Sequence, residues 1–314
     1  MRKREAVLKL LDANSRPDFV PAAFFLHFDP AFHQGQAAVE KHLEYFRYTG
    51  MDFIKIQYER VFPHLPEIRR PEDWARMPKY SKEFYTPQLE AVAGLVKAAK
   101  REALVVQTLY SPFMCAAYTT SGEMLTQHIK ENPEAVKKGM EIITESLMTF
   151  VRSCIELGID GFYHSTQGGE SGRFEDRQLF ETCVKPYDRA LMDEINRTCI
   201  FNILHVCDYN GPYDDLSPYL DYPGQIVNSP LEIAGKMVSP KEIASMLGRP
   251  YMGGLDRKGT LLTGTQAEVR QAALDVLRDA PERFILGADC TVPSEVDWDN
   301  LRTAIATAHE YIID

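Results

Sequence analysis

Hydrophobic and polar positions along this chain follow two alternating patterns. Short apolar runs are rich in β-branched and aromatic residues, as in buried strands. Longer segments place an apolar residue at every third or fourth position, which is the spacing of a helix packed on one face. Eight apolar runs are predicted as strands: Phe19–Phe25, Phe53–Tyr58, Ala103–Leu109, Gly161–His164, Cys199–His205, Gln225–Asn228, Tyr251–Leu255 and Phe284–Leu286.

Helical segments separate these strands. Asn132 and Pro133 predict the start of a long helix that ends at Leu157, because proline is tolerated in a first turn and Gly158 favours the end. The first twelve residues predict an amphipathic helix, since they have a basic start but no apolar signal-peptide core. The other predicted helices are Gln36–Tyr48, Pro87–Arg101, Asp176–Asn196, Pro240–Leu247, Gln266–Arg278 and Trp298–Ile312.

Strands that alternate with helices are typical of a parallel sheet, and eight of them predict closure into a (β/α)8 TIM barrel of the α/β class. An open doubly wound sheet is the alternative. Its dinucleotide-binding form is disfavoured, because no GxGxxG motif follows the first strand. No stretch has the composition of a linker, so we expect residues 1–314 to form one barrel domain with an N-terminal helix.

Composition excludes several classes of partner. The formal net charge is −10 and there is no lysine- or arginine-rich run, which argues against binding nucleic acid or an anionic membrane surface. No segment approaches the roughly 18 consecutive apolar residues of a membrane span. The six cysteines are scattered without a CxxC pair, so we expect no disulfides and a cytoplasmic location.

Polar residues collect where the predicted strands end, and the active site of a TIM barrel lies at the carboxyl ends of its strands. These positions predict a site open to a small molecule. The residues expected to bind substrate there are His27, Tyr58, Tyr110, His164, Gln167 and Asn228.

A possible metal site follows the fifth and eighth predicted strands. His205 and Cys207 are two residues apart, so on extended backbone their side chains leave the same face. Cys290 follows the eighth strand at the same mouth of the barrel. An imidazole and two thiolates suit zinc, and three protein ligands leave a fourth position for water or substrate. The fourth ligand could instead be Glu59 or Asp289. A buried cysteine can also act as a small hydrophobic residue, which is the simpler interpretation of Cys154, Cys183 and Cys199.

Four motifs resemble the uroporphyrinogen decarboxylase-like superfamily, and in order they cover most of the chain. They are Ser111-Pro-Phe-Met-Cys-Ala-Ala-Tyr118, Leu204-His-Val-Cys207, Gly253-Gly-Leu-Asp256 and Ile285-Leu-Gly-Ala-Asp-Cys-Thr-Val-Pro293. The resemblance implies a single (β/α)8 barrel, in agreement with the eight predicted strands.

One branch of this superfamily consists of cofactor-free decarboxylases, which bind the carboxylates of a tetrapyrrole with an arginine-bearing N-terminal segment. The corresponding stretch here, Ala22–Phe32, has no arginine and adds a carboxylate. Glu59 and Ala288 stand where these decarboxylases have an aspartate and a histidine. A substrate with eight carboxylates would find few charged partners in this segment, which disfavours uroporphyrinogen decarboxylation.

The other branch consists of zinc-dependent methyltransferases that act with corrinoid proteins. Their zinc ligands, His-x-Cys and a later Cys, correspond to His205, Cys207 and Cys290. The resemblance implies methyl transfer between a corrinoid and a small thiol, methoxy or amine compound. The corrinoid must come on a separate protein that docks at the barrel mouth, since the Asp-x-His-x-x-Gly motif of corrinoid carriers is absent here.

Three further residues are expected to orient the substrate or supply a proton: Glu59, Tyr118 and Asp256. Each has a structural alternative. Tyr118 could only pack in the barrel mouth, and Asp256 could cap the following helix or pair with Arg257. A metal-free decarboxylase of a tetrapyrrole and a catalytically inactive family member are the alternative functions.

Overall fold

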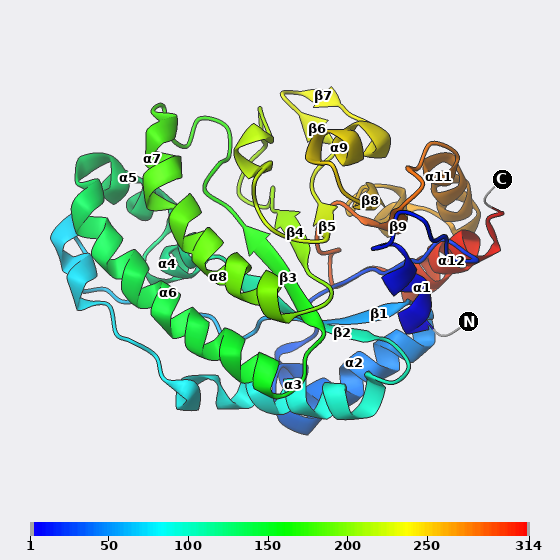
Figure 1. The fold of residues 1–314 in the computed structure, drawn as a ribbon, viewed down its shortest axis with the longest axis horizontal. Helices are drawn as coiled ribbons and strands as arrows, with labels where there is room; N and C mark the ends of the chain where they lie inside the picture. The colour runs from blue at the N-terminus through cyan, green and yellow to red at the C-terminus, as the bar shows by residue number, and fades with distance from the viewer. Residues whose placement is uncertain (1–2, 313–314) are drawn as a thin grey trace.

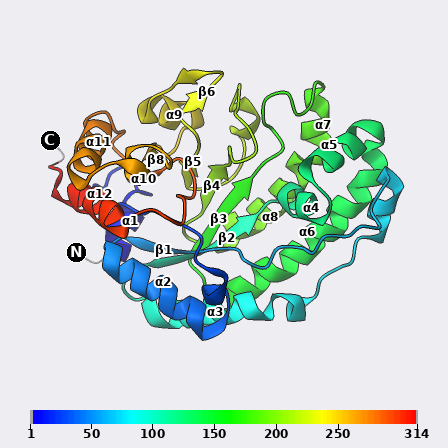
Figure 2. The same cartoon turned by 180° about the vertical axis from the view of Figure 1, so that it is seen from behind.

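A computed structural model describes residues 3–312 of the chain. Its centre is a curved sheet of seven parallel strands in the order β1-β2-β3-β4-β5-β8-β9. Every strand pairs with its neighbour along the chain, apart from a short inserted hairpin (Figures 1 and 2). The strands of the sheet are β1 (Phe53–Ile56), β2 (Leu104–Tyr110), β3 (Gly161–Thr166), β4 (Ile203–Val206), β5 (Ile226–Asn228), β8 (Tyr251–Leu255) and β9 (Phe284–Ala288).

Helices cover the outer face of the sheet (Figures 1 and 2). The α-helices are α1 (Lys3–Lys9), α2 (Gly35–Thr49), α3 (Thr86–Ala99), α4 (Pro112–Thr119), α5 (Gly122–Glu131), α6 (Pro133–Glu156), α7 (Arg177–Cys183), α8 (Lys185–Thr198), α9 (Pro240–Leu247), α10 (Thr260–Thr263), α11 (Gln266–Arg278) and α12 (Trp298–Glu310). Short 3-10 helices span Pro30–Phe32, Pro71–Arg76, Lys82–Tyr85 and Ser217–Tyr219. The antiparallel hairpin of β6 (Glu232–Ile233) and β7 (Lys236–Met237) lies before α9.

The parallel α/β fold predicted from the sequence is confirmed, and it has the architecture of a TIM-like barrel. The first predicted strand, Phe19–Phe25, is wrong as a regular strand. It forms only isolated bridges, from Ala22 to Leu286 and from Leu26 to Val292. Pro21 has no N–H to donate, and the N–H of Ala22 bonds the buried Asp52 carboxylate at 2.7 Å instead of a neighbouring strand.

This irregular segment still lies between the two ends of the sheet. The N–H of Ala23 bonds the Leu286 carbonyl of β9 at 3.0 Å, and the Ala22 carbonyl accepts from the N–H of Asp52 at 3.0 Å, just before β1. The chain's first strand-like segment therefore connects the last strand of the sheet to its first.

One predicted helix is divided in the structure. The predicted helix Asp176–Asn196 is two helices, α7 and α8, which meet at Val184. Pro186 lies in the first turn of α8, where a missing N–H is tolerated, but in a continuous helix this N–H would have to bond the Thr182 carbonyl, so the helix is interrupted there. The N-terminal helix is confirmed over Lys3–Lys9, while Met1 and Arg2 lie outside the described residues.

Aromatic side chains fill the interior of the barrel below its carboxyl ends. The Phe53 ring meets the rings of Phe25 and Phe201 edge to face, at centroid distances of 5.4 and 5.5 Å. Gly161 opens β3 where the backbone passes closest to the segment before β4. A Cβ there would lie 1.6 Å from the Phe201 carbonyl oxygen, so only glycine fits. Among residues 3–312, no helix is long and apolar enough to cross a membrane.

Candidate metal centre

A cavity of about 820 Å³ lies at the carboxyl ends of the strands. It is lined by residues that follow β1, β2, β3, β4 and β9. Most of the residues predicted for the site are among them: His27, Tyr58, Glu59, Tyr110, Tyr118, Gln167, His205, Cys207 and Cys290.

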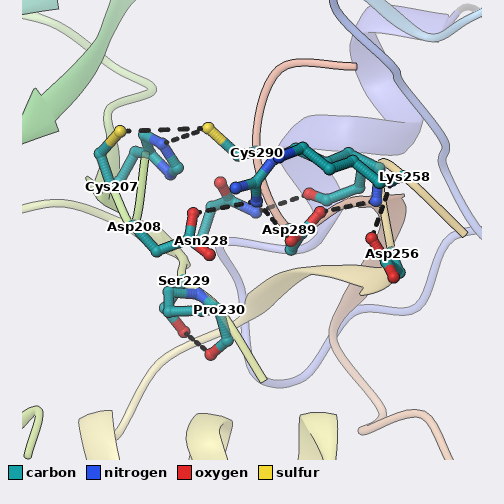
Figure 3. A network of polar contacts seen from close by, with 12 residues as sticks. Cys207, Asp208, Asn228, Ser229, Pro230, Asp256, Lys258, Asp289 and Cys290 are labelled. Atoms are coloured by element: carbon teal, nitrogen blue, oxygen red, sulfur yellow. Dashed lines mark hydrogen bonds and ion pairs between the residues drawn. The ribbon is translucent and has the colours of Figure 1, made fainter. Parts of the chain in front are cut away.

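His205, Cys207 and Cys290 meet on one side of this cavity. The Cys290 Sγ lies 4.0 Å from the Cys207 Sγ and 3.4 Å from the His205 Nε2, and the three ligand atoms all lie within 4.8 Å of one another (Figure 3). A tetrahedral zinc ion with ordinary bond lengths separates two sulfur ligands by about 3.8 Å, and a sulfur from a nitrogen ligand by about 3.6 Å. The donor set and its spacing therefore fit a zinc ion.

Neighbouring strands fix the position of Cys207. Its N–H donates to the Thr166 carbonyl at 3.0 Å, and its own carbonyl accepts from the Tyr213 hydroxyl at 3.1 Å. The Gln167 amide donates to the Cys207 Sγ at 3.4 Å and is held in turn by Asn210. Gln167 was predicted to bind substrate, and in the structure its amide bonds a ligand sulfur.

His205 packs against the ring of Tyr163, with ring centroids 4.9 Å apart. The Tyr163 hydroxyl donates to the Asn228 side chain at 2.5 Å, and the Asn228 amide donates to the carbonyls of Met252 and Ala288. Asn228 was predicted to bind substrate, but it is fully buried and does not line the cavity. Asn228 therefore fixes the position of Tyr163, and the Tyr163 ring in turn supports the ring of His205.

An ion-pair network joins the backbone beside both cysteines. Arg257 Nη1 lies 2.9 Å from Asp208 Oδ1 and 2.5 Å from Asp289 Oδ2. Asp208 follows Cys207 and Asp289 precedes Cys290, and Figure 3 shows the two carboxylates converging beside the cysteines. Asp289, one of the two alternatives predicted for the fourth ligand, is thus paired with Arg257, and no local motif indicates the bridging role of Arg257.

The sulfurs of Cys207 and Cys290 are in hydrogen-bond contact. This contact with Cys290 lowers the pKa of Cys207 well below its usual value, despite burial. The same contact, together with burial, raises the pKa of Cys290. A sulfur of low pKa is the one that first becomes available as a thiolate ligand.

Glu59 is held by two histidines at the cavity wall. Its Oε1 lies 2.9 Å from His27 Nδ1 and its Oε2 lies 3.5 Å from His33 Nδ1. Burial raises the pKa of Glu59, but the hydrogen bond and charge of His27 outweigh it, so the pKa of this carboxyl lies below its usual value. Within the described residues, the metal-ligand group consists of three side chains, and both proposed fourth ligands are bound elsewhere.

Two other predicted site residues lie outside the cavity. His164 is fully buried on the opposite face of β3, with its Nε2 4.0 Å from Asp188 Oδ1 of α8. Burial lowers the pKa of His164 to about 3 and raises that of Asp188 to about 7, so the pair is neutral in mildly acidic conditions. Asp256 is exposed and accepts from the N–H of Lys258 at 2.8 Å, so it caps the turn before α10, and the N-cap residue of that helix is Gly259.

Three tyrosines form one wall of the cavity. Tyr58 is buried, with its ring 5.2 Å from that of Tyr110. The Tyr110 ring stacks on Tyr118, with centroids 6.0 Å apart and an interplanar angle of 3°. Tyr118 is 45% exposed and also lines the cavity.

Lys55 also lines the cavity, and the sequence analysis missed it because it lies within an apolar run. Its side chain comes from the middle of β1 and is 4% exposed. Its Nζ lies over the rings of Phe25 and Tyr163, at 4.7 and 4.5 Å from their centroids. Burial lowers the pKa of Lys55 to about 7, against the opposing effect of Cys290 and Glu59.

Comparison with known proteins now places the chain in a family. The profile of the family described as uroporphyrinogen decarboxylase (URO-D) matches residues 47–311. The chain belongs to this family. The match covers all seven strands of the sheet and the metal-ligand group, and it confirms the resemblance predicted from the four motifs. No curated protein sequence matches the chain.

Solved structures share the fold of this URO-D family member. A methyltransferase from Methanosarcina mazei aligns with a TM-score of 0.76 at 14% sequence identity, over 99% of each chain. A B12-independent methionine synthase from Shewanella sp. W3-18-1, in complex with selenomethionine, aligns with a TM-score of 0.58 at 11% identity, over 93% of each chain. At these identities the likeness concerns the fold.

Proposed function

We propose that this protein is a zinc-dependent methyltransferase that moves a methyl group between a corrinoid and a small thiol, methoxy or amine compound. One observation carries the proposal: His205 and Cys207 meet Cys290 across 83 residues of chain, at spacings that fit tetrahedral zinc. A structural site usually has four protein ligands, whereas three with an adjoining cavity leave a position for substrate.

The protein's own residues provide binding and orientation. When bound, zinc supplies a Lewis acid that holds a thiol as its thiolate or polarises a methoxy or amine heteroatom. The Gln167 amide bonds the Cys207 sulfur and so fixes its direction toward the cavity. Glu59 keeps a proton available at His27 Nδ1, and Tyr118 orients a substrate entering from the rim. Asp256 has no part in this proposal, since it lies outside the cavity.

The corrinoid would be brought by a separate protein that docks at the barrel mouth. Two exposed aromatic side chains at the cavity support this docking site, Tyr118 at 45% and Tyr209 at 78% exposure. Large exposed aromatic residues are typical of binding surfaces, because they bury much area on association.

Metal-free decarboxylation of a tetrapyrrole is the alternative within the family. The basic residues that line the cavity are Lys55, Arg257 and Lys258, and Arg257 is already paired with two carboxylates. Few cations therefore remain for a substrate with many carboxylates, which favours methyl transfer over this alternative.

Metal analysis tests the proposal. The native protein, expressed with zinc, should hold about one zinc ion per chain, and Cys207→Ser and Cys290→Ser should lose most of it. Cys199→Ser is the matched control, because Cys199 is a buried cysteine outside the cavity. Zinc-loaded protein should also demethylate methylcobalamin in the presence of a small thiol. A native protein without zinc, or decarboxylation of uroporphyrinogen that persists in chelator, would overturn the proposal.

A further inference from the structure

The ammonium group of Lys55 is buried without a counterion. Among residues 3–312, no carboxylate oxygen lies within 4.0 Å of its Nζ. Its near contacts are the faces of Phe25 and Tyr163, which attract a cation but replace only part of its hydration. A buried charge of this kind is normally paired, so its missing partner requires an explanation.

Glu59, the acidic residue of the same cavity wall, cannot act as that partner, because two histidines already bind its carboxylate. Both carboxylate oxygens of Glu59 face histidines, His27 at 2.9 Å and His33 at 3.5 Å. Gln57, another side chain of the cavity wall, is neutral and bonds the Leu26 carbonyl and Thr108. Because Lys55 lines the cavity, a molecule bound there can approach its ammonium group.

The same cavity touches Lys55 and the metal-ligand group. Tyr163 lies between them, since its ring contacts the Lys55 ammonium at 4.5 Å and the His205 ring at 4.9 Å. A molecule bound beside His205, Cys207 and Cys290 needs to extend only past this one ring to reach Lys55. Ser165 lies two residues beyond Tyr163 on the same face of β3 and also lines the cavity.

We propose that Lys55 binds a carboxylate group of the small substrate, whose reacting atom lies at His205, Cys207 and Cys290. This inference rests on the proposed function and narrows it to substrates that carry an anionic group. An ammonium–carboxylate contact inside the barrel is charge-assisted and shielded from water, so it discriminates strongly against a neutral analogue.

The test compares two thiols that differ only in charge, 3-mercaptopropionate and 3-mercaptopropanamide. Cobalt(II) is loaded in place of zinc, and thiol binding is followed by the sulfur-to-cobalt absorption band. The native protein should bind the carboxylate at least about tenfold more tightly than the amide. Lys55→Met should reduce this ratio to below about twofold without changing the affinity for the amide, while the exposed Lys97→Met keeps the native ratio.

The outcomes separate this inference from the proposed function. A native protein that takes up neither zinc nor cobalt would overturn the proposed function. A cobalt-loaded native protein that binds the two thiols equally, or binds neither, would overturn the role of Lys55 alone. The same holds if Lys55→Met retains the tenfold preference. Equal binding of the two thiols by the native protein would by itself overturn the role of Lys55, so this outcome does not depend on the variant folding.

Discussion

Arg257 lies 2.9 Å from Asp208, the residue that follows Cys207 after the end of β4. It also pairs with Asp289, which precedes Cys290, so one guanidinium group joins the two chain segments that carry the sulfur ligands. Two carboxylates and two sulfurs lie close together there, and without a cation they would repel one another. The position of Arg257 therefore supports the shape of the candidate metal centre from outside it.

Replacing Arg257 should weaken metal binding without unfolding the protein. We expect Arg257→Gln to lower zinc affinity by about 10- to 100-fold, the range typical of residues that orient metal ligands. Competition with a chromophoric chelator measures the zinc affinity of each variant. Arg270→Gln is the control, because Arg270 pairs with Glu310 on the exposed surface. Equal zinc affinities of the two variants would contradict a positioning role for Arg257.

Lys55 should lower the stability of the folded protein near neutral pH. Its pKa is about 7 in the folded protein, below the ordinary lysine value of 10.5, so the unfolded chain binds more protons between these values. The destabilisation is complete below pH 7 and disappears as the pH rises toward 10.5. Lys55→Met should then raise the free energy of unfolding by about 2–4 kcal/mol at pH 6 and by less at pH 10.

Urea denaturation at both pH values measures this difference, with Lys97→Met as the control for loss of an exposed lysine. A gain from Lys55→Met that is the same at pH 6 and pH 10 would show that packing and not charge is responsible. A stabilising substitution that removes substrate discrimination is the behaviour expected of a functional residue held in an unfavourable environment.

His42 should make the protein sensitive to acid. Burial lowers its pKa to about 4, while its Nδ1 bonds the Ala38 carbonyl at 2.7 Å. Between pH 6.5 and 4 the unfolded chain binds a proton that the folded protein does not, so stability falls as the pH falls. Relative to His42→Gln, the native protein should lose up to about 3 kcal/mol between pH 7 and pH 4. Thermal unfolding across this range checks the slope, and His64→Gln, at an exposed position, should leave it unchanged.

Gly161 should not tolerate a side chain. Since a Cβ would lie 1.6 Å from the Phe201 carbonyl oxygen, Gly161→Ala has to push β3 away from the segment before β4. We expect a loss of about 3 kcal/mol in the free energy of unfolding. Gly122→Ala is the matched control, because its Cβ would meet only the end of the Arg173 side chain at 3.9 Å. Chemical denaturation measures the free energy of unfolding of both variants. Equal stabilities would contradict a close approach between Gly161 and the Phe201 carbonyl.

The metal-ligand group was predictable because a parallel fold turns sequence position into spatial position. His205 and Cys207 share a strand face, and Cys290 follows a strand whose end faces the same mouth. His164 was misplaced for a related reason. Its strand continues to Thr166, and the alternation of side chains puts Tyr163 and Ser165 in the cavity, so His164 faces α8. A strict count along that strand would have corrected the prediction.

Other features depend on contacts between distant segments and have no local signal. Arg257 bridges residues that are 49 and 32 positions away in the sequence, and only the folded chain brings them together. The irregular backbone near Ala22 results from the side chain of Asp52, which accepts the N–H that a strand would use.

Lys55, in contrast, does have a local signal in the sequence, since a single lysine inside a buried strand is itself unusual.

The segment that joins β9 to β1 has a consequence for synthesis of the protein. Its hydrogen-bond partner Leu286 is synthesised much later than the segment itself, and so is Cys290. A nascent chain must therefore carry its N-terminal segment without a neighbour on one side until β9 has been made. Barrel closure and completion of the metal centre then become a single late event, and a chain that stops before β9 achieves neither.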